Sequence, residues 1–128
     1  MKQETRRFVE KAARALRAAE ILLREEEAES AVGRAYYAML HTAQALLRER
    51  GLTYRRHSGV HAAYGEHFAK TNVLDPKFHR WMLAAFDARL KGDYDFEAAI
   101  DAQTAASTIE QAREFLTEAR RYLGAEHA

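Results

Sequence analysis

The sequence predicts an all-α fold, an up-down antiparallel helical bundle with four main helices and one short extra helix. Apolar residues recur at intervals of three and four through most of the chain, which is the period of an amphipathic helix. No segment shows the alternating pattern of a β-strand, and there is no internal repeat. We therefore expect residues 1–128 to form a single domain, with residues 1–2 and 124–128 frayed.

Two long amphipathic segments open the chain. The first covers residues 3–25, and a short acidic connection separates it from the second, which covers residues 30–47. Ser30 is a favourable N-cap residue, and Gly51 after two arginines is a typical signal for the end of a helix. Because the connection is short, we expect these two helices to pack antiparallel.

A basic loop over residues 52–57 follows the second helix. Arg55 and Arg56 stand beside a tyrosine in this loop, a mixture of cations and aromatic rings that is common on RNA-contacting surfaces. An ordinary solvated loop is the alternative. We expect Ser58 to cap the short extra helix, which should cover residues 59–69.

The fourth helix has a clear start signal in Asp75 followed by Pro76, a capping residue and a first-turn proline. We expect this helix to end at Lys91–Gly92. A tight polar connection over residues 93–96 should then lead into a long final helix over residues 97–123, whose apolar residues again recur at three and four.

The predicted helix over residues 30–47 carries three stripes of different chemistry. A broad apolar face and a face of small residues both suit packing against other helices. The apolar face contains Val32, Tyr36, Met39, Leu40, Ala43, Leu46 and Leu47, and the small-residue face contains Ala31, Ala35, Ala38, Thr42 and Ala45. Arg34, Tyr37 and His41 form the third stripe. A helix that packs on two faces lies inside a bundle, so the third stripe should face a groove or an interface.

This polar stripe suits recognition of a phosphate and a base. Arg34 would bind phosphate through its planar guanidinium, Tyr37 would stack on a base or hydrogen-bond to it, and His41 would titrate near neutral pH. The alternative is a structural stripe, in which Arg34 and His41 bond Asp93, Asp95 or the main chain. In that case the protein is a non-catalytic dimeric interaction module.

The overall charge excludes a protein that attracts nucleic acid over its whole surface. The 20 basic residues are almost balanced by 19 acidic ones, so local patches must carry any binding of this kind. No apolar run reaches the length of a membrane span. We therefore expect a cytoplasmic protein that does not contact a membrane.

Metal and thiol chemistry are not expected. The chain contains no cysteine, which excludes disulfides, thiolate metal sites and thiol nucleophiles. His57 and His61 are four residues apart, and His67 and His79 follow, but no acidic residue completes a metal-binding pattern on paired helices. We expect neither a metal ion nor an organic cofactor.

Several stretches of the chain, taken in order, resemble the HEPN domain family, and within it the small stand-alone proteins of the UPF0332 type. They are SAVGRAYYAMLH at residues 30–41, HSGV at 57–60, FAKT at 68–71 and RLKGDYD at 89–95. The resemblance implies a helical bundle that forms a homodimer. It also implies a minimal nucleotidyltransferase as partner, encoded beside it as the other half of a toxin and antitoxin pair.

The resemblance also suggests catalytic residues, because many relatives are metal-independent ribonucleases with an arginine, four to six residues and then a histidine. Arg89 matches that arginine, but Asp93 and Tyr94 stand where the histidine is expected. Arg89, Asp93 and His41 are therefore the catalytic candidates, and ribonuclease activity should be weak or absent. Tyr94 is the candidate for modification by the nucleotidyltransferase, with a hydrogen-bonded turn tyrosine as the alternative.

These observations predict a protein that binds RNA or a nucleotide and acts as the toxin-like or effector member of such a pair. The predicted groove is formed by Arg34, Tyr37, His41, Arg89, Asp93 and Tyr94.

Overall fold

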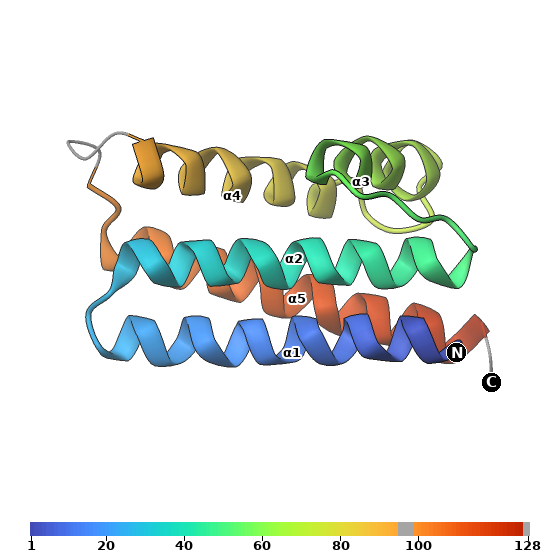
Figure 1. The fold of residues 1–128 in the computed structure, drawn as a ribbon, viewed down its shortest axis with the longest axis horizontal. Helices are drawn as coiled ribbons and strands as arrows, with labels where there is room; N and C mark the ends of the chain where they lie inside the picture. The colour runs from blue at the N-terminus through green and yellow to red at the C-terminus, as the bar shows by residue number, and fades with distance from the viewer. Residues whose placement is uncertain (95–98, 127–128) are drawn as a thin grey trace.

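The computed structural model describes residues 1–94 and 99–126, except for the side chains of residues 94, 125 and 126. The elements are α1 (Gln3–Arg24), α2 (Ala28–Glu49), α3 (His57–Tyr64), the π-helical turn η1 (Gly65–Ala69), α4 (Lys77–Tyr94) and α5 (Ala102–Glu126). The described residues contain no strand. The predicted all-α bundle of four long helices with a short extra helix is confirmed (Figure 1).

Helix α2 lies in the middle of the bundle and packs against α1, α3, α4 and α5. Figure 1 shows α1 on one side of it, α3 and α4 on the other, and α5 crossing behind. Every residue of the two predicted packing faces is buried, from Ala31 and Val32 to Leu46 and Leu47. Burial of each large apolar side chain contributes roughly 1.5–3 kcal/mol, so α2 forms the centre of the core.

The connection between α1 and α2 is tighter than predicted. Glu26 adopts a left-handed conformation (φ 62°), and the amide of Glu27 donates to the carbonyl of Leu22 at 2.8 Å. Helices commonly end in this way at a glycine. Because the residue here is a glutamate, the sequence did not indicate the end of α1. Helix α2 consequently begins at Ala28, and the prediction that Ser30 caps it is wrong, because Ser30 lies inside the first turn.

The end of α2 agrees with the prediction. Gly51 has φ 76°, and its amide donates to the carbonyl of Arg48 at 2.9 Å. The amide of Leu52 donates to the carbonyl of Leu47 at 2.9 Å. These two bonds satisfy carbonyls at the end of the helix, and the chain turns toward α3.

Helix α3 begins at His57, one residue before the predicted cap. Arg56 is the N-cap residue and makes no side-chain capping bond, so the prediction that Ser58 caps the helix is wrong. The helix passes into η1 at Gly65, where a Cβ atom would lie 2.7 Å from the His79 ring. His79 is held in place by a hydrogen bond from Nε2 to the carbonyl of His61, at 3.1 Å. Gly65 therefore allows α4 to approach closely.

Replacing Gly65 with alanine is expected to lower the free energy of unfolding by at least about 1 kcal/mol, because the new methyl group overlaps the fixed His79 ring. Alanine normally stabilises a helix relative to glycine. Gly124→Ala is the matched control, because no atom lies within 4 Å of a Cβ at that position of α5. Urea unfolding of both variants makes the comparison, and a stabilised Gly65→Ala variant would contradict the predicted overlap.

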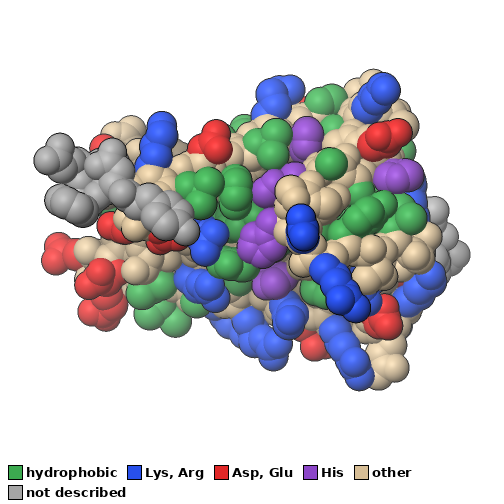
Figure 2. All heavy atoms as spheres, turned by 45° about the horizontal axis from the view of Figure 1, so that its top comes forward, with side chains coloured by type: hydrophobic (Ala, Val, Ile, Leu, Met, Phe, Trp, Pro, Cys, Tyr) green, Lys and Arg blue, Asp and Glu red, His purple; other side chains and the backbone are tan. Residues whose placement is uncertain are grey.

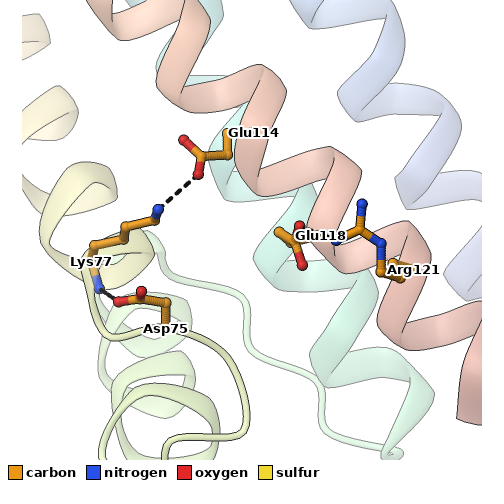
Figure 3. A network of polar contacts seen from close by, with 5 residues as sticks. All are labelled: Asp75, Lys77, Glu114, Glu118 and Arg121. Atoms are coloured by element: carbon orange, nitrogen blue, oxygen red, sulfur yellow. Dashed lines mark hydrogen bonds and ion pairs between the residues drawn. The ribbon is translucent and has the colours of Figure 1, made fainter.

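The predicted start of α4 is confirmed by its cap. The amide of Lys77 donates to Oδ1 of Asp75 at 2.9 Å, next to Pro76 in the first turn. Figure 3 shows that Lys77 also reaches α5, where its Nζ lies 2.7 Å from Oε1 of Glu114. Glu118 pairs with Arg121 one turn further along α5. These exposed pairs stabilise the bundle little, but the Lys77–Glu114 pair shows how α4 and α5 are aligned.

The other end of α4 differs from the prediction. The helix does not stop at Lys91–Gly92 but continues to Tyr94, so Asp93 is helical rather than part of a connection. A Cβ atom on Gly92 would lie 2.9 Å from the side chain of Glu29. Gly92 is therefore a packing residue here, and its reading as a stop signal is wrong.

Helix α5 begins later than predicted, at Ala102 rather than residue 97. The cap is Asp101, whose Oδ1 accepts from the amide of Thr104 at 2.8 Å. Residues 99–101 are not helical, whereas the predicted cap Asp95 and the neighbouring Phe96 lie outside the described residues. The helix extends to Glu126, beyond the expected end at Leu123.

An aromatic cluster joins α3, α4 and α5. Phe78 and Phe115 stack with ring centroids 5.0 Å apart, and Tyr64 meets Phe115 edge-on at 5.3 Å. Tyr64 is fully buried, and no described group hydrogen-bonds its hydroxyl.

In the part of the chain that is described, no helix combines the length and apolarity needed to cross a bilayer.

Candidate functional site

A surface cavity of about 460 Å³ opens where α2, α4 and the end of α1 meet. Its lining residues are Leu22, Glu29, Ser30, Gly33, Arg34, Tyr37, Arg89 and Asp93. Four of these residues were predicted from the sequence to form a site. The structure therefore brings Arg34 and Tyr37 of α2 together with Arg89 and Asp93 of α4.

Both arginines of this cavity contact the ring of Tyr37. The guanidinium carbon of Arg34 lies 4.7 Å from the Tyr37 ring centroid, and that of Arg89 lies 5.1 Å from it. Two cations are thus held against one ring, an arrangement that orients a guanidinium while leaving N–H groups to bind an anion. The cavity can accept a phosphate beside a half-buried aromatic ring.

Carboxylates partly balance these cations. Asp93 Oδ2 lies 3.7 Å from a terminal nitrogen of Arg89, one helical turn away on α4. Both side chains are partly exposed, so this pair contributes only a few tenths of a kcal/mol. No described carboxylate forms an ion pair with Arg34, and Glu29 is a second carboxylate among the lining residues. A bound phosphate would compete with Asp93 for Arg89.

Histidines lie next to the cavity, on the side of α3. The hydroxyl of Tyr36 lies 3.2 Å from Nδ1 of His57 and 2.8 Å from Nε2 of His61. A phenol has one proton, so it donates to one imidazole and accepts from the other. The His57 ring also meets the Tyr37 ring edge-on at 5.7 Å. Figure 2 shows histidine side chains in a row across one face of the molecule, with lysine and arginine side chains beside them.

The surroundings favour neutral imidazoles. Burial lowers the pKa of His61, and the positive charge that His57 and His79 can carry lowers it further. Burial is also the main cause of the lowered pKa of His57, with a second contribution from Arg89. Burial raises the pKa of the Tyr36 phenol. Tyr36, His57 and His61 are therefore all neutral and hydrogen-bonded at pH values above the range in which ordinary histidines titrate.

His41 does not line the cavity, although it was predicted to. Its Nδ1 lies 2.8 Å from Oε1 of Gln44 on the same helix, so Nδ1 carries the proton of this bond. Its ring centroid is 5.9 Å from that of Tyr37. Burial lowers the pKa of His41 despite the bond to Gln44, and Lys11 and Arg34 add to the decrease. His41 thus lies beside Tyr37 but outside the cavity.

The remaining predicted residues are less well connected to the cavity. Arg55 and Arg56 are exposed in the loop that leads into α3, directly before His57. The backbone of Tyr94 ends α4, and its side chain lies outside the described residues. The modification of Tyr94 therefore stays a prediction. The expected tight connection over residues 93–96 is wrong at its start, because Asp93 and the backbone of Tyr94 belong to α4.

The residues that sequence reasoning missed are Tyr36, His57 and His61 as a hydrogen-bonded unit. Tyr36 was assigned to the apolar face, which is correct for its ring, since the residue is fully buried. A buried tyrosine hydroxyl needs a partner, and the pair His57 and His61 at i and i+4 was available. The pair was considered only as a metal site; within the described residues no three His, Asp or Glu side chains converge as ligands.

Comparisons with known proteins identify the family of this chain. The HEPN domain family matches residues 5–122. A Methanocaldococcus jannaschii protein named "Putative toxin MJ0142" is 33% identical over 95% of this chain and 83% of its own length. A second protein of that organism, named in the same way, is 30% identical over 96% of this chain and 91% of its own length. A Thermotoga maritima "UPF0332 protein" is 35% identical over 77% of this chain and 74% of its own length. The chain belongs to the HEPN domain family.

Proposed function

We propose that this protein binds the phosphate of a nucleotide or of RNA in the cavity between α2 and α4. The observation that carries the proposal is the pair of guanidinium groups, of Arg34 and Arg89, held against the Tyr37 ring in an open cavity. Arginine binds phosphate through several N–H groups in one plane. Tyr37 offers a surface on which a base stacks.

We also propose that the protein is the toxin-like or effector member of a pair with a minimal nucleotidyltransferase and that it acts as a homodimer. Two relatives that cover almost the whole chain carry toxin names. The family resemblance adds the partner and the dimer. Co-expression with a nucleotidyltransferase encoded next to this gene, followed by purification, tests this part of the proposal.

Ribonuclease activity is expected to be weak or absent. Metal-independent cleavage needs a base for the 2′-hydroxyl, an acid for the leaving oxygen and positive charge on the phosphorane. Arg89 can supply the charge, but Asp93 occupies the turn in which a histidine is expected, and carboxylates are weaker bases than imidazoles. His41 is the remaining candidate imidazole, and its ring lies beside Tyr37 rather than in the cavity. Incubation with RNA in EDTA measures this activity.

Replacing Arg34 or Arg89 with glutamine is expected to weaken binding of 5′-AMP about tenfold each, because each change removes a charge-assisted hydrogen bond to phosphate. Asp93→Asn should strengthen binding, because it removes the carboxylate that competes for Arg89. Isothermal titration calorimetry at one fixed salt concentration gives the dissociation constants.

The control for these variants is Arg121→Gln on α5, which removes an exposed arginine that is paired with Glu118 and lies outside the cavity. Its affinity for 5′-AMP should equal that of the wild type. Equal affinity in the Arg34→Gln and Arg89→Gln variants as well would refute the proposed phosphate site.

The alternative interaction module assigns the polar stripe a structural role. His41 bonds Gln44 of its own helix, so this bond does not fasten α2 to the helices that follow. The contact of Tyr37 with Arg89 does join α2 to α4, yet it leaves the cavity open. The observed geometry therefore favours binding over a purely structural stripe.

A further inference from the structure

We propose that Phe8, Lys11 and Arg48 form a second binding site and that both sites hold one single-stranded polynucleotide. The phosphate of one nucleotide would occupy the cavity beside Tyr37, and a neighbouring part of the same strand would occupy the second site. This inference rests on the proposed function. It adds that the ligand is a polynucleotide rather than a free nucleotide.

The second site is built like the first. A cavity of about 270 Å³ is lined by Glu4, Arg7, Phe8, Lys11 and Arg48. Lys11 Nζ lies 5.5 Å from the Phe8 ring centroid, and the guanidinium carbon of Arg48 lies 5.1 Å from it. A half-buried aromatic ring again holds two cations against it, here between α1 and α2.

His41 connects the two sites. Its ring centroid lies 5.9 Å from that of Tyr37 and 6.0 Å from that of Phe8, and it is tilted by 37° to each of these rings. All three rings are partly exposed. We call this row of Tyr37, His41 and Phe8, together with the cations at its two ends, the aromatic track.

Positive charge accompanies the aromatic track along its length. Arg34 and Arg48 belong to the same stripe of α2 and lie about 21 Å apart along the helix axis. Lys11 lies against the Phe8 ring and Arg34 against the Tyr37 ring, and both of these rings contact His41. The positive charge therefore bridges the two cavities.

This combination fits a single strand better than other ligands. Proteins that bind single strands join a basic groove, which follows the phosphates, to aromatic rings, on which successive bases stack. Bases in a duplex are already stacked on one another and are not free for the rings. A free nucleotide would fill one cavity and leave the rest of the track without a role.

Glu4 is the counter-ion of the second site. Its Oε2 lies 2.6 Å from a terminal nitrogen of Arg48, and 63% of its side chain is exposed. A phosphate at this site would displace the carboxylate, much as a phosphate in the first cavity would displace Asp93. Glu4→Gln should therefore strengthen binding of an oligonucleotide that reaches the second site.

The test compares UMP with oligouridylates of increasing length, by fluorescence competition at one salt concentration. Wild-type affinity is expected to increase with length until a strand reaches both cavities. Lys11→Gln and Phe8→Leu should each weaken binding of the hexamer about tenfold and leave UMP binding unchanged. The first change removes a charge-assisted hydrogen bond to phosphate, and the second removes the ring on which one base stacks. Oligothymidylates of equal length distinguish RNA from DNA as the strand.

The matched control is Arg17→Gln, an exposed arginine about 120° around α1 from Lys11. It should bind the hexamer like the wild type. Because Phe8 is part of the core rim, the melting temperature of Phe8→Leu is measured as well, and Lys11→Gln, a surface change, is the decisive variant. Hexamer affinity that is unchanged in Lys11→Gln and in Glu4→Gln overturns the second site.

The outcomes separate this inference from the proposed function. If Arg34→Gln weakens UMP binding while length has no effect, the phosphate site stands and the aromatic track is refuted. If Arg34→Gln and Arg89→Gln bind both UMP and the hexamer like the wild type, the phosphate site itself is refuted.

Discussion

The free energy of unfolding is expected to decrease as the pH falls below about 6.5, before carboxylates begin to titrate. His41, His57 and His61 are the cause, because burial lowers the pKa of each below the ordinary value of 6.5. The unfolded chain therefore takes up protons first. Each imidazole can contribute a slope of up to about 1.4 kcal/mol per pH unit within its own window.

The sign of the effect follows from which state binds the proton. Above about pH 6.5 the imidazoles are neutral in both states, and their full contribution to stability is present. As the pH decreases toward the lowered pKa of the folded state, only the unfolded state is protonated, and stability is lost. In the folded state a charged His57 would lie near Arg89, and a charged His41 near Lys11 and Arg34.

Chemical denaturation between about pH 7.5 and 5, followed by circular dichroism, measures this dependence. His61→Gln removes the most buried of the three imidazoles and should make the curve shallower. His67→Gln removes an imidazole that lies outside the cluster, on η1, and is the matched control. A wild-type curve that stays flat over this range would show that the folded protein accommodates the charged rings.

Tyr36→Phe is expected to lower the free energy of unfolding by about 1–3 kcal/mol at neutral pH. The change removes only the hydroxyl that bonds His57 and His61, and it leaves the buried ring nitrogen of His61 without its partner. The cost is that of an unsatisfied buried polar group. Denaturant unfolding at about pH 7.5 measures it.

Tyr64→Phe is the control for this substitution. Tyr64 is as completely buried as Tyr36, but no described group hydrogen-bonds its hydroxyl. Removing that hydroxyl should leave stability unchanged or raise it by up to about 1 kcal/mol. Equal losses in Tyr36→Phe and Tyr64→Phe would mean that the size of the phenol, and not the bonds to the imidazoles, determines the effect.

Much of the fold was predictable because helical periodicity and caps are local signals. The two packing faces of α2, the Asp75–Pro76 start of α4 and the Gly51 end of α2 could all be recognised from neighbouring residues. The errors come from one tertiary contact and from one unusual backbone conformation. Gly92 resembles a stop signal until Glu29 is placed against it, and Glu26 takes a conformation that usually requires glycine.

The candidate site was predictable for the residues that share one helix. Arg34 and Tyr37 follow from the pattern of α2, and Arg89 and Asp93 from the family resemblance. The hydrogen bonds of His57 and His61 to Tyr36 were not predictable, because these histidines reach Tyr36 only after α3 folds back onto α2. The same holds for Phe8, whose helical stripe on α1 gave no indication of its neighbour His41.

The division of α2 into buried faces and one exposed stripe also affects how such proteins diverge. Buried core residues and the residues of the proposed binding site alternate along the same 22-residue helix, yet they point in different directions. A lineage can therefore replace the exposed Arg34 without disturbing the core. Binding can be gained, altered or lost in descendants that keep an almost unchanged fold.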